Sequence, residues 1–324
     1  MSMDRRTFLG LTGVGLTGVG LTGVGLTGVG LTGALALPRA YGATAEAATV
    51  AAPMRRKLPG STEALPVIGM GTADTFNVGR SAEERAPLAE VMSLLLRDAP
   101  GGVVDTAPSY GSAEGVTGDL LQTANARTRV FLATKISTSH ASAPAQFSES
   151  LAALHADTID LLQVHNLIDW RENLRWMRQL KEARKVRYIG ITHYRDDAHE
   201  QLAQILRSER VDFLQVNYSL AERNAEKVLL PLAQERGVAV LINRPFQDGR
   251  MFSAVRGKTI PDWAGEIDCN SWGQLFLKFI VSHPAVTAAI PATSKPRNMA
   301  DNLGAGFGRM PDARERGRIA ALLA

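Results

Sequence analysis

Short apolar runs alternate with longer amphipathic stretches along most of the chain, from about Met54 onward. Most runs are continuous in valine, isoleucine and leucine, which is typical of parallel strands that are covered on both faces. The runs predict strands at Leu65–Gly71, Gly102–Asp105, Val130–Lys135, Thr158–Val164, Val186–Thr192, Phe213–Asn217, Val238–Asn243 and Val286–Pro291. The stretches between them predict helices at Ala82–Arg97, Ala145–Ala156, Glu172–Ala183, Asp196–Arg210 and Asn224–Arg236.

This alternation predicts an α/β fold, namely a single-domain (β/α)8 TIM barrel over residues 54–324. A doubly wound sheet is the alternative, but such a sheet normally carries a G-x-G-x-x-G phosphate loop after an early strand. The tripeptide Gly69-Met70-Gly71 has no third glycine at the required spacing. The segment Arg56–Pro66 is a candidate for a hairpin that plugs the bottom of the barrel.

The first 43 residues have a different character from the rest of the chain. The unit Leu-Thr-Gly-Val-Gly repeats over residues 11–30, and residues 7–38 carry no charge. The stretch is long enough to span a bilayer, although glycine at this density disfavours a helix by about 1 kcal/mol per position against alanine. We therefore exclude this low-complexity segment from the predicted fold.

Upstream of the repeat, Arg5-Arg6-Thr7-Phe8-Leu9 resembles the twin-arginine (Tat) export signal. Small residues at positions 40–45 offer a cleavage site for a signal peptidase. We predict a Tat-type signal peptide over residues 1–43, transport by the Tat translocase, and a location in the bacterial periplasm. An uncleaved membrane anchor and a flexible linker are the alternatives.

Composition excludes several classes of protein. Hydrophobic residues make up 45% and charged residues 21% of the chain, which is ordinary for a soluble globular protein. The net charge of +4 is small and no basic run is dense, so no nucleic-acid partner is predicted. Cys269 is the only cysteine, which excludes an internal disulfide. No metal is predicted, because no cluster has the spacing of metal ligands; the oligomeric state stays open.

Polar side chains end several of the predicted strands. In a TIM barrel the active site lies where the strands end, at the carboxyl face. Asp105 ends the second strand, Lys135 the third and His165 the fourth. Later strand ends carry Thr192-His193, Gln215 with Asn217, and Asn243-Arg244. Charged residues at the ends of two successive strands predict a functional site at this mouth.

The segment Val104–Glu114 reads Val-Asp-Thr-Ala-Pro-Ser-Tyr-Gly-Ser-Ala-Glu and resembles the Asp-Thr-Ala-x-x-Tyr-Gly signature of the aldo-keto reductases. Lys135 and His165 follow at the next two strand ends, in that family's order. The resemblance covers roughly residues 54–310 and implies NAD(P)H-dependent reduction of an aldehyde or ketone to an alcohol. It implies that the catalytic residues are Asp105, Tyr110, Lys135 and His165.

Physical chemistry supports these implied roles. A free tyrosine has a pKa of about 10, and a neighbouring ammonium lowers that pKa, so we expect Lys135 to tune Tyr110 as the proton donor. Asp105 is expected to pair with Lys135 and keep it charged. Hydrogen bonds from Tyr110 and His165 are expected to orient the carbonyl and stabilise the charge that develops on its oxygen.

The segment Ile290–Asn302 joins a strand, a turn of small hydroxyl residues and the start of a helix, an arrangement that favours anions. The resemblance implies that this segment holds the adenosine end of the cofactor, and it favours NADP(H) over NAD(H). The implied contacts are the 2′-phosphate for Thr293, Ser294 and Lys295, and the adenine for Asp301 and Asn302. Asn298 stands where the family often has an arginine stacked on adenine.

The resemblance also implies a site for the nicotinamide end of the cofactor. Thr192, His193 and Gln215 match the residues that hold the amide of the ring. Asn243 stands where the family often has an aromatic residue stacked on the nicotinamide. We expect Arg244, the next residue, to compensate by contacting the pyrophosphate.

The loops expected to shape the substrate pocket are Ala73–Gly79, Asn166–Trp170 and Phe246–Cys269. The aromatic side chains of these loops predict a partly aromatic pocket for a small-molecule carbonyl substrate. They are Phe76, Trp170, Phe246, Phe252 and Trp263. A cofactor-binding sensor or accessory subunit on the same barrel is the alternative function, favoured by the atypical His193 and Asn243. Hydrolysis is a third interpretation, disfavoured because the sequence has no metal cluster and no extra pair of acids.

Overall fold

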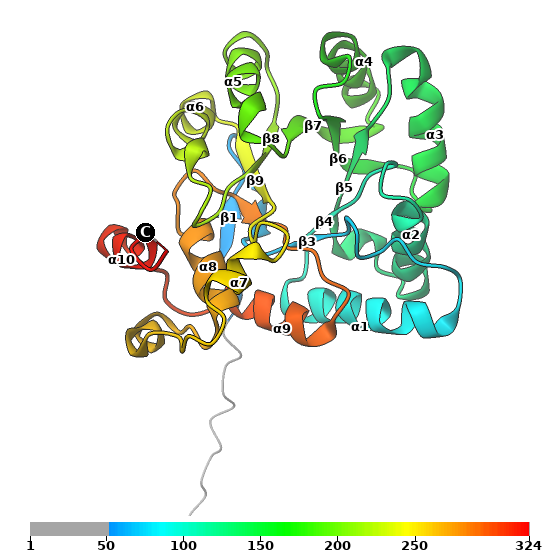
Figure 1. Ribbon diagram of the computed structural model, residues 1–324. Coiled ribbons are helices and arrows are strands. Elements are labelled where there is room, and N and C mark those ends of the chain that lie inside the picture. The colour runs from blue at the N-terminus through cyan, green and yellow to red at the C-terminus, as the bar shows by residue number, and fades with distance from the viewer. Residues whose placement is uncertain (1–51, 324) are drawn as a thin grey trace, which may run out of the picture. The chain divides into compact units, whose positions relative to one another are not determined.

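The computed structural model describes residues 52–323, and Figure 1 shows the strands at the centre with helices around them. Eight strands pair in parallel in the order β10-β9-β8-β7-β6-β5-β4-β3. They are β3 (Met70–Gly71), β4 (Val103–Asp105), β5 (Phe131–Ile136), β6 (Ile159–His165), β7 (Val186–His193), β8 (Phe213–Asn217), β9 (Ala239–Asn243) and β10 (Ala288–Ala289). Bridges from Ile68 to Ala289 and from Gly71 to Ala292 join the two edges, so the sheet closes into a barrel.

The helices alternate with the strands and lie outside the barrel (Figure 1). They are α1 (Ala82–Asp98), α2 (Ala113–Thr123), α3 (Ala143–Ala153), α4 (Trp170–Glu182), α5 (His199–Ser208), α6 (Leu229–Arg236), α7 (Arg250–Ala254), α8 (Trp272–Val281), α9 (Pro296–Gly304) and α10 (Ala313–Ala320). Ser81 caps α1 by accepting the Glu84 N–H at 3.2 Å. Gly237 ends α6 at a φ of 65°, a left-handed conformation that glycine adopts without strain. The predicted single-domain (β/α)8 fold is confirmed.

Side chains inside the barrel alternate with side chains that pack against the helices, because successive residues of a strand point to opposite faces. The inner apolar cluster includes Val103, Phe131, Ala133, Leu161, Phe213 and Leu241. In three of these strands, the residue two positions after an inner apolar residue is a polar residue of the predicted site. Asp105 follows Val103 in this way, Lys135 follows Ala133, and Gln215 follows Phe213. The alternation that fills the barrel with apolar side chains therefore carries the polar ones to its mouth.

The predicted hairpin precedes the barrel. β1 (Arg55–Lys57) pairs antiparallel with β2 (Ala64–Pro66). Leu58 and Leu65 join the inner cluster beside side chains such as Phe131, which begins its strand. The hairpin therefore closes the amino-terminal end of the barrel and leaves the carboxyl end open for a site.

The extent of the first predicted strand, Leu65–Gly71, is wrong. The Val67 N–H donates to the Met54 carbonyl, whereas the Gly69 N–H donates to the Ala289 carbonyl on the far edge of the sheet. The chain thus changes hydrogen-bond partners inside one apolar run. Only Met70–Gly71 pairs with β4, and the residues before it belong to the hairpin and its connection.

A backbone hydrogen bond connects the first and last parts of the barrel sequence. The Met54 N–H donates to the Gly306 carbonyl at 2.7 Å, which ties the start of the barrel to its last part. Among residues 52–323, no helix combines the length and the apolar character needed to cross a membrane. The predicted signal peptide over residues 1–43 lies outside the described residues.

Candidate active site

Lys135 and Asp105 form a buried ion pair at the mouth of the barrel. Lys135 Nζ donates to Asp105 Oδ2 at 2.6 Å and to the Thr106 carbonyl at 2.9 Å. The Lys135 side chain has no exposed surface, and that of Asp105 is 4% exposed. Burial alone lowers the pKa of Lys135, but the charge of the Asp105 carboxylate and its hydrogen bond to Lys135 outweigh burial and hold the pKa above its usual value. The pair predicted from the sequence therefore exists.

The second oxygen of Asp105 is held by two glutamines. Gln163 Nε2 donates to Asp105 Oδ1 at 3.1 Å, and Gln215 Nε2 donates to it at 2.8 Å. Gln215 Oε1 in turn accepts from Thr192 Oγ1 at 3.1 Å. Sequence reasoning missed Gln163, although it precedes His165 by two residues and so faces the barrel interior as His165 does.

Tyr110 lies on the loop after β4, between the ion pair and His165. Lys135 Nζ is 4.8 Å from the centre of the Tyr110 ring, and the His165 ring meets it edge-on with 5.8 Å between centroids. Burial raises the pKa of Tyr110, Lys135 lowers it, and Asp105 raises it, so the pKa stands above its usual value. Lys135 thus acts in the expected direction, but the expected net lowering is wrong because burial outweighs it.

His165 is neutral and bound on one side by hydroxyls. Ser137 Oγ lies 2.8 Å from His165 Nδ1, and Ser109 Oγ lies 3.2 Å from the same nitrogen. Burial, with the charge of Lys135 nearby, lowers the pKa of His165 to about 3. At neutral pH this ring can therefore donate one hydrogen bond and accept at its other nitrogen.

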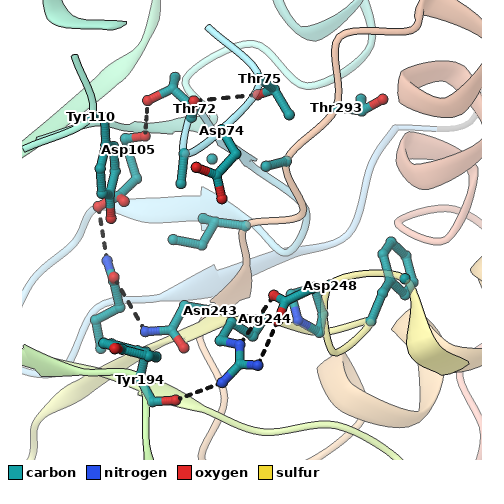
Figure 2. Close-up of a pocket in the computed structure, with 18 of the residues that line it drawn as sticks. Thr72, Asp74, Thr75, Asp105, Tyr110, Tyr194, Asn243, Arg244, Asp248 and Thr293 are labelled. Carbon is teal, nitrogen blue, oxygen red and sulfur yellow. Dashed lines mark hydrogen bonds and ion pairs between the residues drawn. The ribbon is translucent and has the colours of Figure 1, made fainter. Parts of the chain in front are cut away.

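A cavity of about 1070 Å³ opens at the carboxyl end of the strands. Figure 2 shows Tyr110 and Asp105 on one side of it, Thr293 on another, and Arg244 with Asp248 along a third. The predicted site residues in its lining are Asp105, Tyr110, His165, Thr192, Gln215, Arg244, Thr293, Asp301 and Asn302. Lys135 is fully buried behind Asp105, and the lining does not include His193, Ser294 or Lys295.

His193 and Arg244 are engaged with their own neighbours. The His193 ring stacks on Tyr194 with 5.5 Å between centroids and 5° between planes. Arg244 Nη2 and Nε donate to the Asp248 carboxylate at 2.6 and 3.1 Å, and Arg244 Nη1 donates to the Tyr194 carbonyl at 3.2 Å. Arg244 thus lines the cavity although it is already paired with Asp248. Tyr194 also lines the cavity, whereas His193 does not.

The predicted nucleotide segment forms a turn and the first part of α9. The Lys295 N–H donates to Thr293 Oγ1 at 3.1 Å, which fixes the turn. Asp301 accepts from Ser271 Oγ at 2.7 Å and from Gln274 Nε2 at 2.9 Å, so its carboxylate anchors the start of α8. Lys295 and Arg297 are exposed at the start of α9.

The predicted aromatic pocket is only partly present. Phe246 and Phe252 line the cavity, with 4.9 Å between their centroids. The other three are engaged elsewhere: Phe76 has no exposed surface and belongs to the core, while Trp170 and Trp263 pack beneath the guanidinium groups of Arg171 and Arg318. The lining around Tyr110 is instead polar and includes Thr72, Asp74, Ser109 and Asn166.

The comparison with known families agrees with this geometry. The model of the aldo/keto reductase family matches residues 67–314, which is most of the chain. The chain belongs to the aldo/keto reductase family. The family places it among the oxidoreductases, and the matched residues contain all four side chains of the predicted tetrad.

Individual aldo/keto reductases resemble the chain at a distance. Methylglyoxal reductase YeaE of Escherichia coli is 28% identical over 233 residues, which are 69% of this chain and 80% of that protein. The NADH-specific methylglyoxal reductase of the same organism is 25% identical over 195 residues, 50% of this chain and 57% of that protein. The chain thus spans little more than half the length of some curated relatives, 56% for aldo-keto reductase YhdN of Bacillus subtilis.

A solved structure supports the same conclusion. The aldo/keto reductase of Klebsiella pneumoniae in complex with NADP and acetate is 25% identical, with a TM-score of 0.68. The similarity covers 82% of this chain and 94% of that one. The barrel of this aldo/keto reductase is therefore shared along nearly the whole length of a relative that was crystallised with NADP.

Proposed function

We propose that this chain reduces an aldehyde or ketone to an alcohol with NADPH as the hydride source. The observation that carries the proposal is the convergence of Asp105, Tyr110, Lys135 and His165 at one cavity. The nicotinamide cofactor supplies a hydride to the carbonyl carbon when it is bound. Two relatives named as methylglyoxal reductases support the carbonyl chemistry. A neighbour crystallised with NADP supports the choice of NADPH, whereas one of the two relatives is named as NADH-specific.

Tyr110 is the proposed proton donor. Its hydroxyl gives a proton to the carbonyl oxygen while the carbon gains the hydride, and these two additions together yield the alcohol. Lys135, whose Nζ lies 4.8 Å from the centre of the ring, stabilises the phenolate that Tyr110 leaves. Asp105 keeps Lys135 charged at that position, and neutral His165 donates a hydrogen bond to the same oxygen.

Asn243 supports a nicotinamide site without a stacked aromatic ring. Its Oδ1 is buried with no hydrogen-bond partner among the described residues, and the residue lines the cavity. A buried acceptor without a donor costs roughly 1–3 kcal/mol. A rotation of the Asn243 amide toward the cavity would let this oxygen accept the carboxamide N–H of the nicotinamide, with Gln215 and Thr192 beside it, so we assign the amide of the ring to these three residues.

The opposite end of the cavity fits an adenosine phosphate. We propose that Lys295 and Arg297 bind the 2′-phosphate, because both are exposed at the helix start beside Thr293. Their charge favours NADPH over NADH. Arg244 contacts the pyrophosphate by exchanging the Asp248 carboxylate for phosphate oxygens.

Phe252 offers a face for the adenine that Asn298 cannot supply. Phe252 is 41% exposed, unusual for a large apolar side chain, and it lines the cavity. A Cβ placed on Gly273 would lie 3.8 Å from the Phe252 ring and 2.9 Å from Asp301 Oδ2, so the ring and Asp301 are neighbours. We assign adenine stacking to Phe252, with Asp301 and Asn302 at the edge of the base.

A cofactor-binding sensor on the same barrel is the second candidate function. The observation that favours it is the replacement of nicotinamide-side residues: His193 packs outside the lining, and Asn243 replaces a stacked ring. A sensor needs cofactor affinity without turnover. Titration of the purified chain with NADPH and NADH, followed by 4-nitrobenzaldehyde, separates the two functions, because only a reductase oxidises the cofactor.

We also propose that the Tat-type signal over residues 1–43 directs export to the periplasm. Tat export carries folded proteins, so the cofactor would be bound before transport and retained afterwards. Cell fractionation with sequencing of the mature amino terminus tests this proposal. A chain that stays in the cytoplasm when its two arginines are intact contradicts export, whereas a full-length chain in the membrane fraction indicates an uncleaved anchor.

A further inference from the structure

The tetrad histidine is contacted on one side by two serine hydroxyls. Ser137 Oγ lies 2.8 Å from His165 Nδ1, and Ser109 Oγ lies 3.2 Å from it. Ser137 directly follows β5, while Ser109 directly precedes Tyr110. Two separate segments therefore place a hydroxyl on the same ring nitrogen, and the other nitrogen, Nε2, has no hydrogen-bond partner among residues 52–323.

The hydrogen-bond chemistry of these groups favours one of the two neutral forms of the ring. A neutral imidazole has one N–H and one lone pair, and a serine hydroxyl always has a proton to donate. Within the described part of the chain, His165 Nδ1 is the sole hydrogen-bond partner of both serine hydroxyls. The single lone pair on Nδ1 accepts the proton of Ser137 at 2.8 Å, and Ser109 at 3.2 Å shares it more weakly; an N–H there would donate to a serine oxygen and leave the hydroxyl protons without a protein acceptor.

We propose that Ser137 and Ser109 hold His165 in the Nε2–H tautomer, so that the ring presents an N–H donor to the oxygen of the substrate carbonyl. The second clause of this inference rests on the proposed reductase function, whereas the tautomer itself does not. The low pKa of His165 agrees with a ring that stays neutral through the working range of pH. The two serines are positioning residues, because they act on the substrate through His165.

This arrangement also strengthens the donor. A hydrogen bond accepted at Nδ1 polarises the ring and makes the N–H at Nε2 a better donor. The benefit grows as negative charge develops on the carbonyl oxygen, so it appears in the transition state more than in the ground state. Tyr110 remains the source of the proton, and His165 supplies a fixed dipole.

Nitrogen-15 NMR of the full chain with labelled histidine measures the tautomer directly. The chain has six histidines, and His165→Asn assigns the His165 signals by their loss. We expect the Nε2–H tautomer in the wild-type chain and a substantial Nδ1–H population in the Ser109→Ala/Ser137→Ala double variant. A wild-type ring in the Nδ1–H tautomer overturns the inference, whatever the activity of the chain.

Kinetics test the consequence for catalysis. Ser137→Ala is expected to lower kcat for 4-nitrobenzaldehyde about three- to tenfold, the loss of one hydrogen bond, while the Kd of NADPH stays unchanged. Ser137→Thr keeps a hydroxyl and is expected to retain most of the activity. Ser139→Ala is the matched control, because Ser139 is exposed and its side chain caps no helix.

The two failures are distinguishable. An unchanged kcat in the Ser109→Ala/Ser137→Ala variant contradicts a positioning role for the serines, even if the chain is an active reductase. A chain that binds NADPH but reduces no carbonyl contradicts the proposed function. In that case the Nε2–H tautomer in the wild type and its loss in the double variant still support the assignment of the two serines.

Discussion

Lys135 Nζ lies 2.6 Å from Asp105 Oδ2, and both side chains are almost completely buried. Both carboxylate oxygens of Asp105 accept hydrogen bonds, because Lys135 donates to Oδ2 while Gln163 and Gln215 donate to Oδ1. A buried charge is stable only when it is paired and hydrogen-bonded. The chain therefore maintains an ammonium beside Tyr110 through a buried hydrogen-bonded network. Burying this charge has an energetic cost that a purely structural barrel would not need.

Asp105→Asn is predicted to destabilise the fold and to reduce activity together. Removing one partner of a buried ion pair leaves the other charge uncompensated, which costs about 3–5 kcal/mol. Urea unfolding, with aldehyde reduction assayed in parallel, measures both effects. The control is Asp197→Asn, which removes the exposed pair between Arg195 and Asp197 and is expected to change stability by about 1 kcal/mol or less. Equal effects of the two variants would contradict the buried network.

Stability is predicted to fall on acidification partly through His165. Its pKa is about 3 in the folded chain and about 6.5 in an unfolded one, so the unfolded state binds more protons between these values. The stability that a neutral His165 contributes is present above about pH 6.5 and is lost as the pH falls, by roughly 2 kcal/mol at pH 5. His165→Asn should therefore lose less stability between pH 7 and pH 5 than the wild type, as measured by urea unfolding at both pH values. An equal loss in the two chains would contradict this role of His165.

Lys295 and Arg297 are predicted to set the cofactor preference. The double change Lys295→Ala/Arg297→Ala should raise the Kd of NADPH about tenfold, because charge-assisted contacts to a phosphate are lost. The Kd of NADH should change little, since NADH has no 2′-phosphate. Fluorescence titration measures both constants, with the exposed Lys185→Ala as the control. A parallel rise for both cofactors would place these side chains on a group that NADH also carries.

Phe252 is predicted to bind the adenine of both cofactors. Stacking of a base on an aromatic ring contributes about 1–3 kcal/mol, so Phe252→Ala should raise the Kd of NADPH and of NADH about fivefold or more. The KM of the aldehyde should stay close to the wild-type value. Val228→Ala truncates another exposed apolar side chain that lies outside the cavity lining. A change confined to the aldehyde KM would reassign Phe252 to the substrate pocket.

The sequence was sufficient to predict the barrel and the gathering of Asp105, Lys135 and His165 at one mouth, and the reason is visible in single strands. Tyr110 lies on a loop and was implied only by the resemblance to the family. Apolar runs such as Phe131–Ala133 end in a polar residue, Lys135, that keeps the inward direction of the residue two places before it. Parallel strands bring such ends to one mouth. The prediction for Leu65–Gly71 failed because an apolar run does not reveal where the chain changes its hydrogen-bond partner.

Features that depend on neighbouring segments could not be predicted. Gln163 stands inside an apolar strand, and its partner Asp105 is visible only once β4 and β6 are placed in the barrel. Ser137 is an ordinary loop residue until its hydroxyl is found beside His165. The pocket was expected to be more aromatic than it is, because a loop aromatic such as Phe76 faces the core as readily as a cavity.

The proposed reductase activity is tested most directly by a titration of the purified chain with NADPH and NADH, followed by addition of 4-nitrobenzaldehyde, in the wild type and in Tyr110→Phe. The phenylalanine keeps the ring and removes only the hydroxyl that donates the proton. We predict that both chains bind NADPH with similar Kd, that the wild type oxidises it when aldehyde is added, and that Tyr110→Phe does not. Binding without oxidation in the wild type across a wide carbonyl panel would contradict the reductase and favour the sensor.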